Sequence, residues 1–187
     1  MNEASLRQGR RQFFCACAAL ATAGLAGLAG LSACSPAADS ATSAAPGNFD
    51  GQSSCSLDGM LLGDYPGPKG QIRYRGDAQP SWFCDSVELL STLLKPEQLK
   101  PVASAHVQDM AKADWERPQG HWIDARQAVY VLGSKRQGSM GPTAASFADV
   151  AAAQAFATQW GGRVLRFAEL RTEMVDLSGG ALHDSRM

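Results

Sequence analysis

Three kinds of functional signature are missing from this sequence, and each absence narrows the function. Basic residues are not clustered, and 17 Lys and Arg stand against 18 Asp and Glu, so the basic face of a nucleic-acid-binding protein is lacking. No Ser/His/Asp set for nucleophilic catalysis and no phosphate-binding glycine loop is evident. The chain has only three histidines, whereas a zinc site usually draws on several Cys and His residues. We therefore expect no nucleic-acid partner and no enzymatic activity.

The first 33 residues have the composition of an export signal. Arg7, Arg10 and Arg11 precede an apolar run over residues 13–31 that is rich in Ala, Gly and Leu, which is the pattern of a signal peptide. The run ends in Leu-Ser-Ala-Cys34, which resembles a bacterial lipobox. Cys34 is therefore predicted to carry the lipid, including palmitate, and to begin the mature protein. The alternative is a transmembrane anchor that is never cleaved.

The export route and the final membrane are less closely specified. Arg10-Arg11-Gln-Phe-Phe14 resembles a twin-arginine signal, although a Sec signal can also carry adjacent arginines. Either route predicts a periplasmic protein anchored to a membrane. Ser35 follows the lipid-bearing cysteine, and under the usual sorting pattern this residue favours the outer membrane.

Removal of the signal would leave 154 residues with 14 basic and 17 acidic side chains, enough for one compact domain. Residues 34–48 are rich in Ala, Ser, Pro and Thr and are expected to form a flexible tether. The folded domain is predicted over residues 49–177, followed by a mobile tail over 178–187. Cys55 and Cys84 remain, and in an oxidising compartment they could form a disulfide.

The folded domain is predicted to be α+β, with two similar ββαβ halves at about 49–112 and 113–177. Asp85 and Ser86 are N-cap residues for the first helix, and Asp149 is one for the second. The segment 109–124 is expected to be a long connection packed by Trp115 and Trp122. Predicted strands cover residues 71–75, 81–84, 102–108, 128–132, 143–147 and 164–167, and predicted helices cover 87–94 and 150–160.

Sulfur atoms of two kinds are concentrated in the stretch Cys55-Ser-Leu-Asp-Gly-Met60. Thiolate and thioether are the side-chain ligands that select Cu(I), so Cys55 and Met60 are candidate ligands. Met60 could instead fill a gap in the core. Met140 lies in a Gly-Ser-Met-Gly loop and is the candidate third ligand. Cys84 precedes a predicted helix N-terminus, which favours thiolate, or it could pack in the core beside Trp82.

The remaining polar candidates are weaker. His183 lies in the predicted tail four residues before Met187 and could fold over a metal. His106 lies in a strand pattern and His121 lies beside Trp122, so both are expected to be structural. Asp58 is expected to stabilise its own turn through the backbone.

Several of these motifs, taken in order, resemble the NosL family of periplasmic copper lipoproteins encoded with nitrous oxide reductase. The resemblance covers residues 55–173 and includes Cys-x-x-Asp-Gly-Met60, Asp64-Tyr-Pro-Gly-Pro-Lys69 and Trp82-Phe-Cys-Asp85, together with the Gly138–Gly141 loop. Many family members have Cys-x-x-Cys-Gly-Met, whereas this chain has Asp58 in place of the second cysteine, which leaves one thiolate with Met60.

This resemblance implies a Cu(I) chaperone whose fold is similar to that of organomercurial lyase. It also implies delivery of copper to an ABC-type assembly complex and so to nitrous oxide reductase, in denitrification. Two alternatives remain open. One is a structural lipoprotein in which Cys55 and Cys84 form a disulfide, and the other is a thiol-dependent enzyme like organomercurial lyase that uses both cysteines and Asp58.

Overall fold

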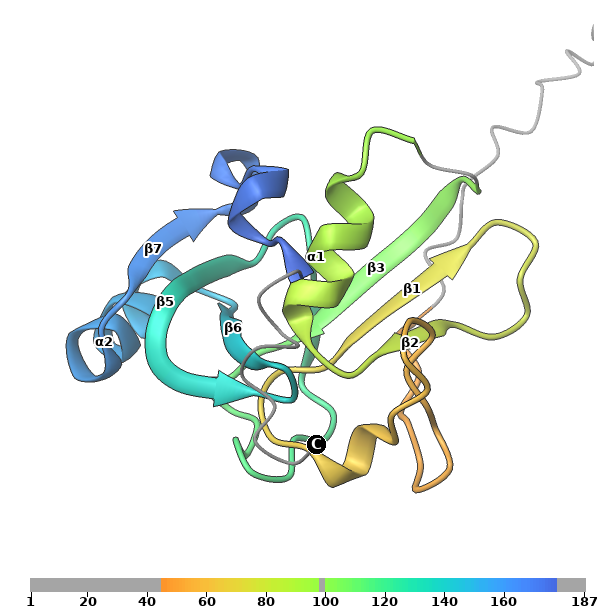
Figure 1. Ribbon diagram of the computed structural model, residues 1–187, viewed down its shortest axis with the longest axis horizontal. Helices are drawn as coiled ribbons and strands as arrows, with labels where there is room; N and C mark the ends of the chain where they lie inside the picture. Colours follow the sequence, from red (N-terminus) through yellow and green to blue (C-terminus); the bar gives the residue numbers. More distant parts are fainter. Residues whose placement is uncertain (1–44, 98–99, 178–187) are drawn as a thin grey trace, which may run out of the picture. The chain divides into compact units, whose positions relative to one another are not determined.

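A computed structural model describes residues 45–97 and 100–177 of the chain (Figure 1). The predicted signal peptide, the predicted lipid attachment residue Cys34 and the tail with His183 lie outside the described residues. Within the described residues, no helix combines the length and the apolar character that crossing a membrane would need.

The described residues form two antiparallel sheets, two α-helices and three short 3₁₀ helices. The first sheet has the strand order β2-β1-β3-β4 and the second has the order β6-β5-β7. The strands are β1 (Gly70–Tyr74), β2 (Ser81–Phe83), β3 (Val102–Gln108), β4 (Trp122–Asp124), β5 (Val129–Gly138), β6 (Gly141–Phe147) and β7 (Arg163–Arg166). The helices are α1 (Ser86–Leu94), α2 (Val150–Trp160), η1 (Leu62–Asp64), η2 (Phe167–Glu169) and η3 (Thr172–Met174).

The two halves share one topology. Each half runs strand, strand, helix, strand, and in each sheet the first strand of the half, β1 or β5, lies between the other two. The prediction of an α+β fold with two similar halves is confirmed. The first sheet carries one additional edge strand, β4, which pairs with β3.

Two segments differ from the prediction. Residues 122–124 were expected in the long connection, but they form β4, whose three residues are too few to give a periodic signal.

The strand expected at 128–132 continues to Gly138 as the strongly curved β5 in Figure 1. Its second part is polar, and Gly133 has a φ of 75° beside a register shift. Arg136 in this part is nevertheless half-buried, with its guanidinium 4.4 Å from the Trp115 ring centroid.

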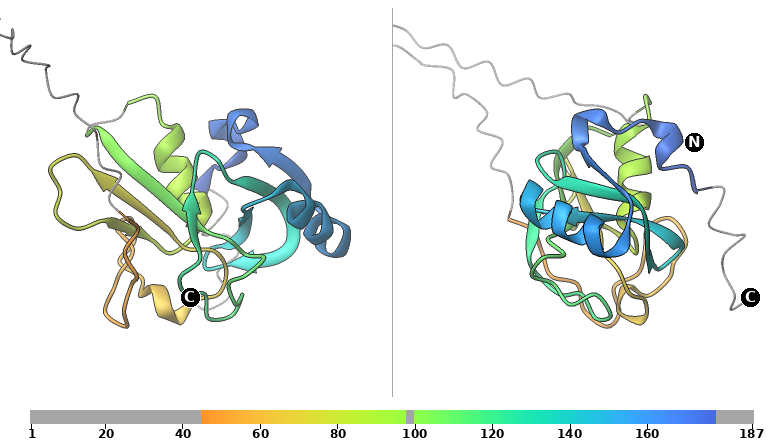
Figure 2. Two further views of the ribbon diagram at one scale, coloured as in Figure 1. Left: turned by 180° about the vertical axis from the view of Figure 1, so that it is seen from behind. Right: turned by 90° about the vertical axis from the view of Figure 1, so that its left-hand side faces the viewer.

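Helix α1 packs in the main core against both sheets, as the views in Figures 1 and 2 show. Leu89 and Leu90 are fully buried and belong to one cluster with Ile72 of β1 and Tyr130 of β5. Each such buried apolar side chain contributes about 1.5–3 kcal/mol relative to an exposed one. The first helix therefore joins the two halves through its apolar face.

Helix α2 covers the other face of the second sheet. Val131 and Phe147 pack in a second cluster with Ala153 of α2 and with Trp115. Tyr130, the residue before Val131, lies in the main core instead, so alternate residues of β5 are buried on opposite faces. Burial on both faces explains why residues 128–132 are continuously apolar.

The N-terminus of α1 is fixed by contacts to the second half. The Asp85 carboxylate accepts hydrogen bonds from Val87 N (2.9 Å) and from Thr143 Oγ1 (2.6 Å). The Ser86 hydroxyl donates to the Ala144 carbonyl at 2.6 Å. Gly138 is required here, because a Cβ at this position would collide with Asp85 Oδ2.

Substitution of Asp85 should test this junction. We expect Asp85→Ala to lower the free energy of unfolding by about 2–4 kcal/mol, because the helix loses its cap and the buried Thr143 hydroxyl loses its acceptor. Urea unfolding measures the change. Asp149→Ala is the matched control, since Asp149 caps α2 at an exposed site through Ala152 N and should cost only about 1 kcal/mol. Equal losses in the two variants would contradict the interpretation.

Candidate metal centre

Residues 55–60, which we call the thiol loop, form a tight turn that returns the chain on itself. Cys55 N donates to Met60 O at 2.8 Å, and Gly59 N donates to Cys55 O at 2.9 Å. Gly59 has a φ of 79°, a conformation that favours glycine. The Asp58 side chain accepts from Met60 N at 2.9 Å, which confirms that it stabilises the turn.

The thiol loop is held against the strand that leads to the second cysteine. Ser56 N donates to Trp82 O of β2 at 2.8 Å. Cys84 follows β2 directly and is fully buried. Ser139 Oγ, from the turn between β5 and β6, lies 2.8 Å from Cys84 O and 3.2 Å from Cys84 Sγ. The second half of the chain thus positions this cysteine.

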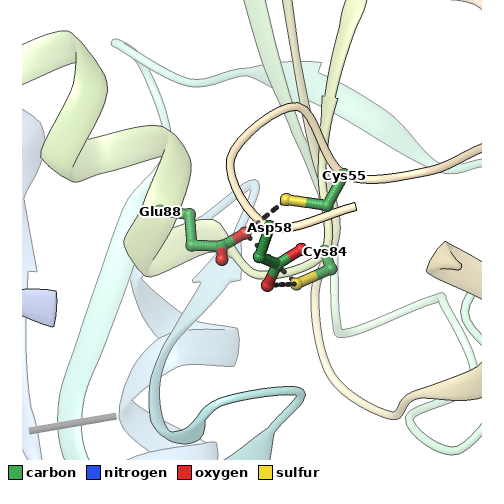
Figure 3. A group of neighbouring side chains, drawn as sticks. All are labelled: Cys55, Asp58, Cys84 and Glu88. Atoms are coloured by element: carbon green, nitrogen blue, oxygen red, sulfur yellow. Dashed lines mark hydrogen bonds between the residues drawn. The ribbon is translucent and has the colours of Figure 1, made fainter. Parts of the chain in front are cut away.

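Glu88 brings the two thiols together from the first turn of α1 (Figure 3). Its Oε2 lies 3.2 Å from Cys55 Sγ and 3.2 Å from Cys84 Sγ. Asp58 Oδ2, from the thiol loop, lies 3.7 Å from Cys84 Sγ. One ligand atom from each of these four residues lies within 4.8 Å of all the others. Both cysteines are free thiols.

The predicted methionines lie in the same cluster as the cysteines. Met60 and Met140 are partly buried and pack against the group that includes Cys55 and Cys84. An aromatic wall completes this group, with Trp82 and Trp122 ring centroids 5.9 Å apart. On the outer side, Leu57 and Leu61 are exposed, one within the thiol loop and one directly after it. Apolar side chains therefore flank the buried cysteines, while two leucines at the thiol loop are exposed.

The two thiols differ in acidity. Hydrogen bonding with Cys84 lowers the pKa of Cys55 to about 6, against the opposing effect of burial. The same hydrogen bond and burial raise the pKa of Cys84. Burial, with the nearby Cys55, raises the pKa of Glu88 to about 8. These contacts therefore favour the thiolate form of Cys55 and the protonated forms of Cys84 and Glu88.

A buried lysine lies behind the thiols. Lys69 is fully buried, and its Nζ donates to Cys84 O at 2.9 Å and to Pro66 O at 3.0 Å. Burial lowers the pKa of Lys69, and the nearby Asp85, Cys84 and Glu88 act in the opposite direction. This side chain holds the Cys84 backbone and lies close to the acidic groups of the site.

The structure brings together four of the five predicted ligand residues. Cys55, Cys84, Met60 and Met140 share one cluster, whereas His183 lies outside the described residues. His106 is buried in β3 and His121 is exposed.

Sequence reasoning missed Glu88 as a member of the site, and it assigned Asp58 only to the turn. The available signal for Glu88 was its spacing from Cys84, four residues further along a predicted helix start. Residues at this spacing lie on the same side of a helix.

The donor set is suited to a soft metal ion. Thiolate and thioether sulfur select soft ions such as Cu(I), while carboxylate oxygen suits harder divalent ions. The thiols lie at the junction of three segments, the thiol loop, the end of β2 and the start of α1. No single segment could assemble this group alone.

Comparison with known proteins identifies the family of this chain. The "Copper-binding lipoprotein NosL" of Stutzerimonas stutzeri is 41% identical over 148 residues, which span 76% of each chain. The protein of that name from Achromobacter cycloclastes is 40% identical over 120 residues, 62% of each chain. The crystal structure of the copper chaperone NosL from Shewanella denitrificans has a TM-score of 0.62 and 39% identity, covering 65% of this chain and 92% of that one. The NosL family model matches residues 46–175, and the chain belongs to the NosL family.

Proposed function

We propose that this protein is a copper chaperone that binds Cu(I) at the cluster around Cys55 and Cys84. The relatives named above are described as copper-binding or as a copper chaperone. The single observation that carries the proposal is the approach of two free thiols, with their sulfur atoms within 4.8 Å of each other. Thiolates this close can bind one soft ion between them.

Cys55 and Cys84 are the proposed thiolate ligands, and Met60 and Met140 are the proposed thioether ligands. His183 is a further proposed ligand from the C-terminal tail. The Cys55 thiolate is available at neutral pH because its pKa is about 6, so one ligand needs no deprotonation before copper arrives. Few soft ligands and an exposed thiol loop favour exchange of the metal, which a carrier requires.

The proposal extends to a wider role, which the composition of the N-terminus and the family support. We propose that residues 1–33 are removed, that Cys34 carries the lipid and that residues 34–48 form a tether to a folded domain at 49–177. Gly47 and Asn48, at the end of this tether, hydrogen-bond to Gln71 and Trp122. The anchored protein would pass copper to an ABC-type assembly complex and so to nitrous oxide reductase in the periplasm.

Copper titration tests the ligand set. Reduced, anaerobic protein spanning residues 35–187 should bind one Cu(I) per chain in competition with a chromophoric Cu(I) chelator. Cys55→Ser and Cys84→Ser should each lose this binding, because one thiolate remains. Met60→Leu, Met140→Leu and His183→Gln should weaken it. Met174→Leu is the control, since Met174 packs against the main core.

Two results would contradict the proposal. Equal copper uptake by the wild type and both cysteine variants would show that the thiols are structural. The absence of titratable thiols in protein taken from the periplasm, together with no copper uptake, would favour the alternative of a disulfide-linked structural lipoprotein.

The pH dependence of the thiols gives a second test. In the copper-free protein, thiolate absorbance should rise through about pH 6 as Cys55 ionises, while Cys84 stays protonated in this range. Cys84→Ala removes the hydrogen bond that lowers the pKa of Cys55, so this rise should move to higher pH. Cys55→Ala should remove it. An unchanged midpoint in Cys84→Ala would show that the two thiols do not interact.

The anchor can be tested separately. Cys34→Ala should move the protein from the membrane fraction to the soluble fraction and should abolish incorporation of labelled palmitate. Cys55→Ala is the control, because it should leave both properties unchanged. Retention of Cys34→Ala in the membrane would instead support an uncleaved transmembrane anchor.

A further inference from the structure

We propose that residues 47–49, which we call the strap, act as a latch that holds the thiol loop closed against Cys84. The strap lies in no helix or strand of the described chain, and it belongs to the orange part of the ribbon in Figure 1. Its release would free one end of the thiol loop and let Cys55 move away from Cys84. The latch itself does not depend on copper, whereas its effect on the metal rests on the proposed function.

Three hydrogen bonds attach the strap to the first sheet. Gly47 N donates to Gln71 Oε1 at 3.0 Å, and Gln71 Nε2 donates to Gly47 O at 2.9 Å. Trp122 Nε1 donates to Asn48 Oδ1 at 3.1 Å. The sheet takes part in each bond through a side chain of β1 or β4. The strap can therefore leave without breaking a backbone hydrogen bond of the sheet, which is the kind of contact that opens locally.

Phe49 is the apolar part of the latch. This residue is 6% exposed, and its ring centroid lies 6.0 Å from that of Trp82 and 6.5 Å from that of Trp122. Both contacts are edge-to-face, an arrangement that aromatic pairs prefer. Phe49 belongs to the same packed cluster as Cys55 and Cys84. Its departure would therefore leave a gap in the packing around the thiols.

A tight turn connects the strap to the base of the thiol loop. Asp50 N donates to Ser53 Oγ at 3.0 Å, and Ser53 Oγ donates to Asp50 Oδ1 at 2.8 Å. Leu62 N donates to Ser53 O at 3.0 Å, and Ser54 forms an isolated β-bridge with Leu61. The turn and the base of the thiol loop are therefore one hydrogen-bonded unit, which should move together.

Buried apolar side chains fix this unit at both ends. Phe49 precedes it and Leu62 ends it, and both are buried in the same cluster. Between them, Leu57 in the thiol loop is 47% exposed. Loss of the Phe49 end would leave the unit attached at Leu62, so the thiol loop could turn outward and carry Cys55 away from Cys84.

The position of the strap gives the latch a function. The strap overlaps the end of the proposed tether, residues 34–48, so it is where the anchored chain would enter the folded domain. With the strap in place, Cys55 and Met60 of the thiol loop are held in one cluster with Cys84 and Met140. With the strap released, the first two proposed ligands would leave together, and copper would be retained less firmly and offered to an acceptor.

Thiol modification tests the latch in the mature lipidated protein, reduced, copper-free and solubilised in detergent. N-ethylmaleimide should modify Cys55 at least about tenfold faster in Phe49→Ala than in the wild type, because loss of a buried phenylalanine shifts a local opening equilibrium by at least this factor. Gln71→Met removes both hydrogen bonds to Gly47 and should accelerate the reaction about two- to tenfold. Peptide mass spectrometry locates the modified cysteine, at a pH well above the pKa of Cys55, which is about 6.

Two comparisons separate release of the strap from general instability. Phe156→Ala is the matched control, since Phe156 is an aromatic residue of the second cluster, stacked on Trp115 at 5.5 Å. It should lower global stability but leave the Cys55 rate unchanged. Local opening exposes little surface, so the rate in Phe49→Ala should be nearly independent of low urea concentrations, whereas modification through global unfolding rises steeply. Where Phe49→Ala does not fold, Gln71→Met decides the outcome.

The copper-free measurement separates the latch from the copper proposal. Equal Cys55 rates in the wild type and both strap variants would overturn the latch, and so would equal acceleration in Phe156→Ala or a steep urea dependence. Faster modification in the strap variants, with no Cu(I) binding by the wild type, would overturn the copper function and leave the latch in place. Transfer of Cu(I) to an excess of chelator should also be faster in both strap variants, and unchanged transfer would overturn the effect on copper release.

Discussion

The site depends on the contacts that the Glu88 carboxyl group makes at the start of α1. It accepts from Asp85 N to close the capping box, and the same oxygen lies 3.2 Å from both thiols. Glu88 Oε2 therefore takes part both in the helix cap and in the contacts that bring the two cysteines together. Because α1 also joins the two sheets through Leu89 and Leu90, the geometry of the thiols is coupled to the packing of the whole domain.

The second half of the chain supports the site although it supplies neither cysteine. Ser139 contacts both the carbonyl and the sulfur of Cys84, and Thr143 donates to the cap residue Asp85. Gly138 has no side chain where a Cβ would meet Asp85. These contacts explain why the two halves of the fold form a single functional unit. The first half of the chain therefore supplies the two thiols, and residues of the second half hold Cys84 and the cap residue in position.

Local signals in the sequence were sufficient for most elements but not for the site. Asp85 and Asp149 marked both helix starts correctly, because capping is an interaction within one turn. The meeting of Cys55 with Cys84 spans many residues, and it depends on the hydrogen bond from Ser56 to Trp82, which no periodicity encodes. The polar half of β5 was missed because it has no hydrophobic pattern. Arg136 is half-buried here through its contact with the ring of Trp115, which is distant in the sequence.

Asp58 places a carboxylate where the motif that the sequence resembles often has a second cysteine. This carboxylate approaches Cys84 to 3.7 Å. A second thiol therefore still reaches the loop, but it comes from the end of β2. Cys84 is fully buried, whereas Asp58 is exposed. The exposed donor of the cluster is therefore a hard oxygen, whereas both soft sulfur atoms belong to buried residues.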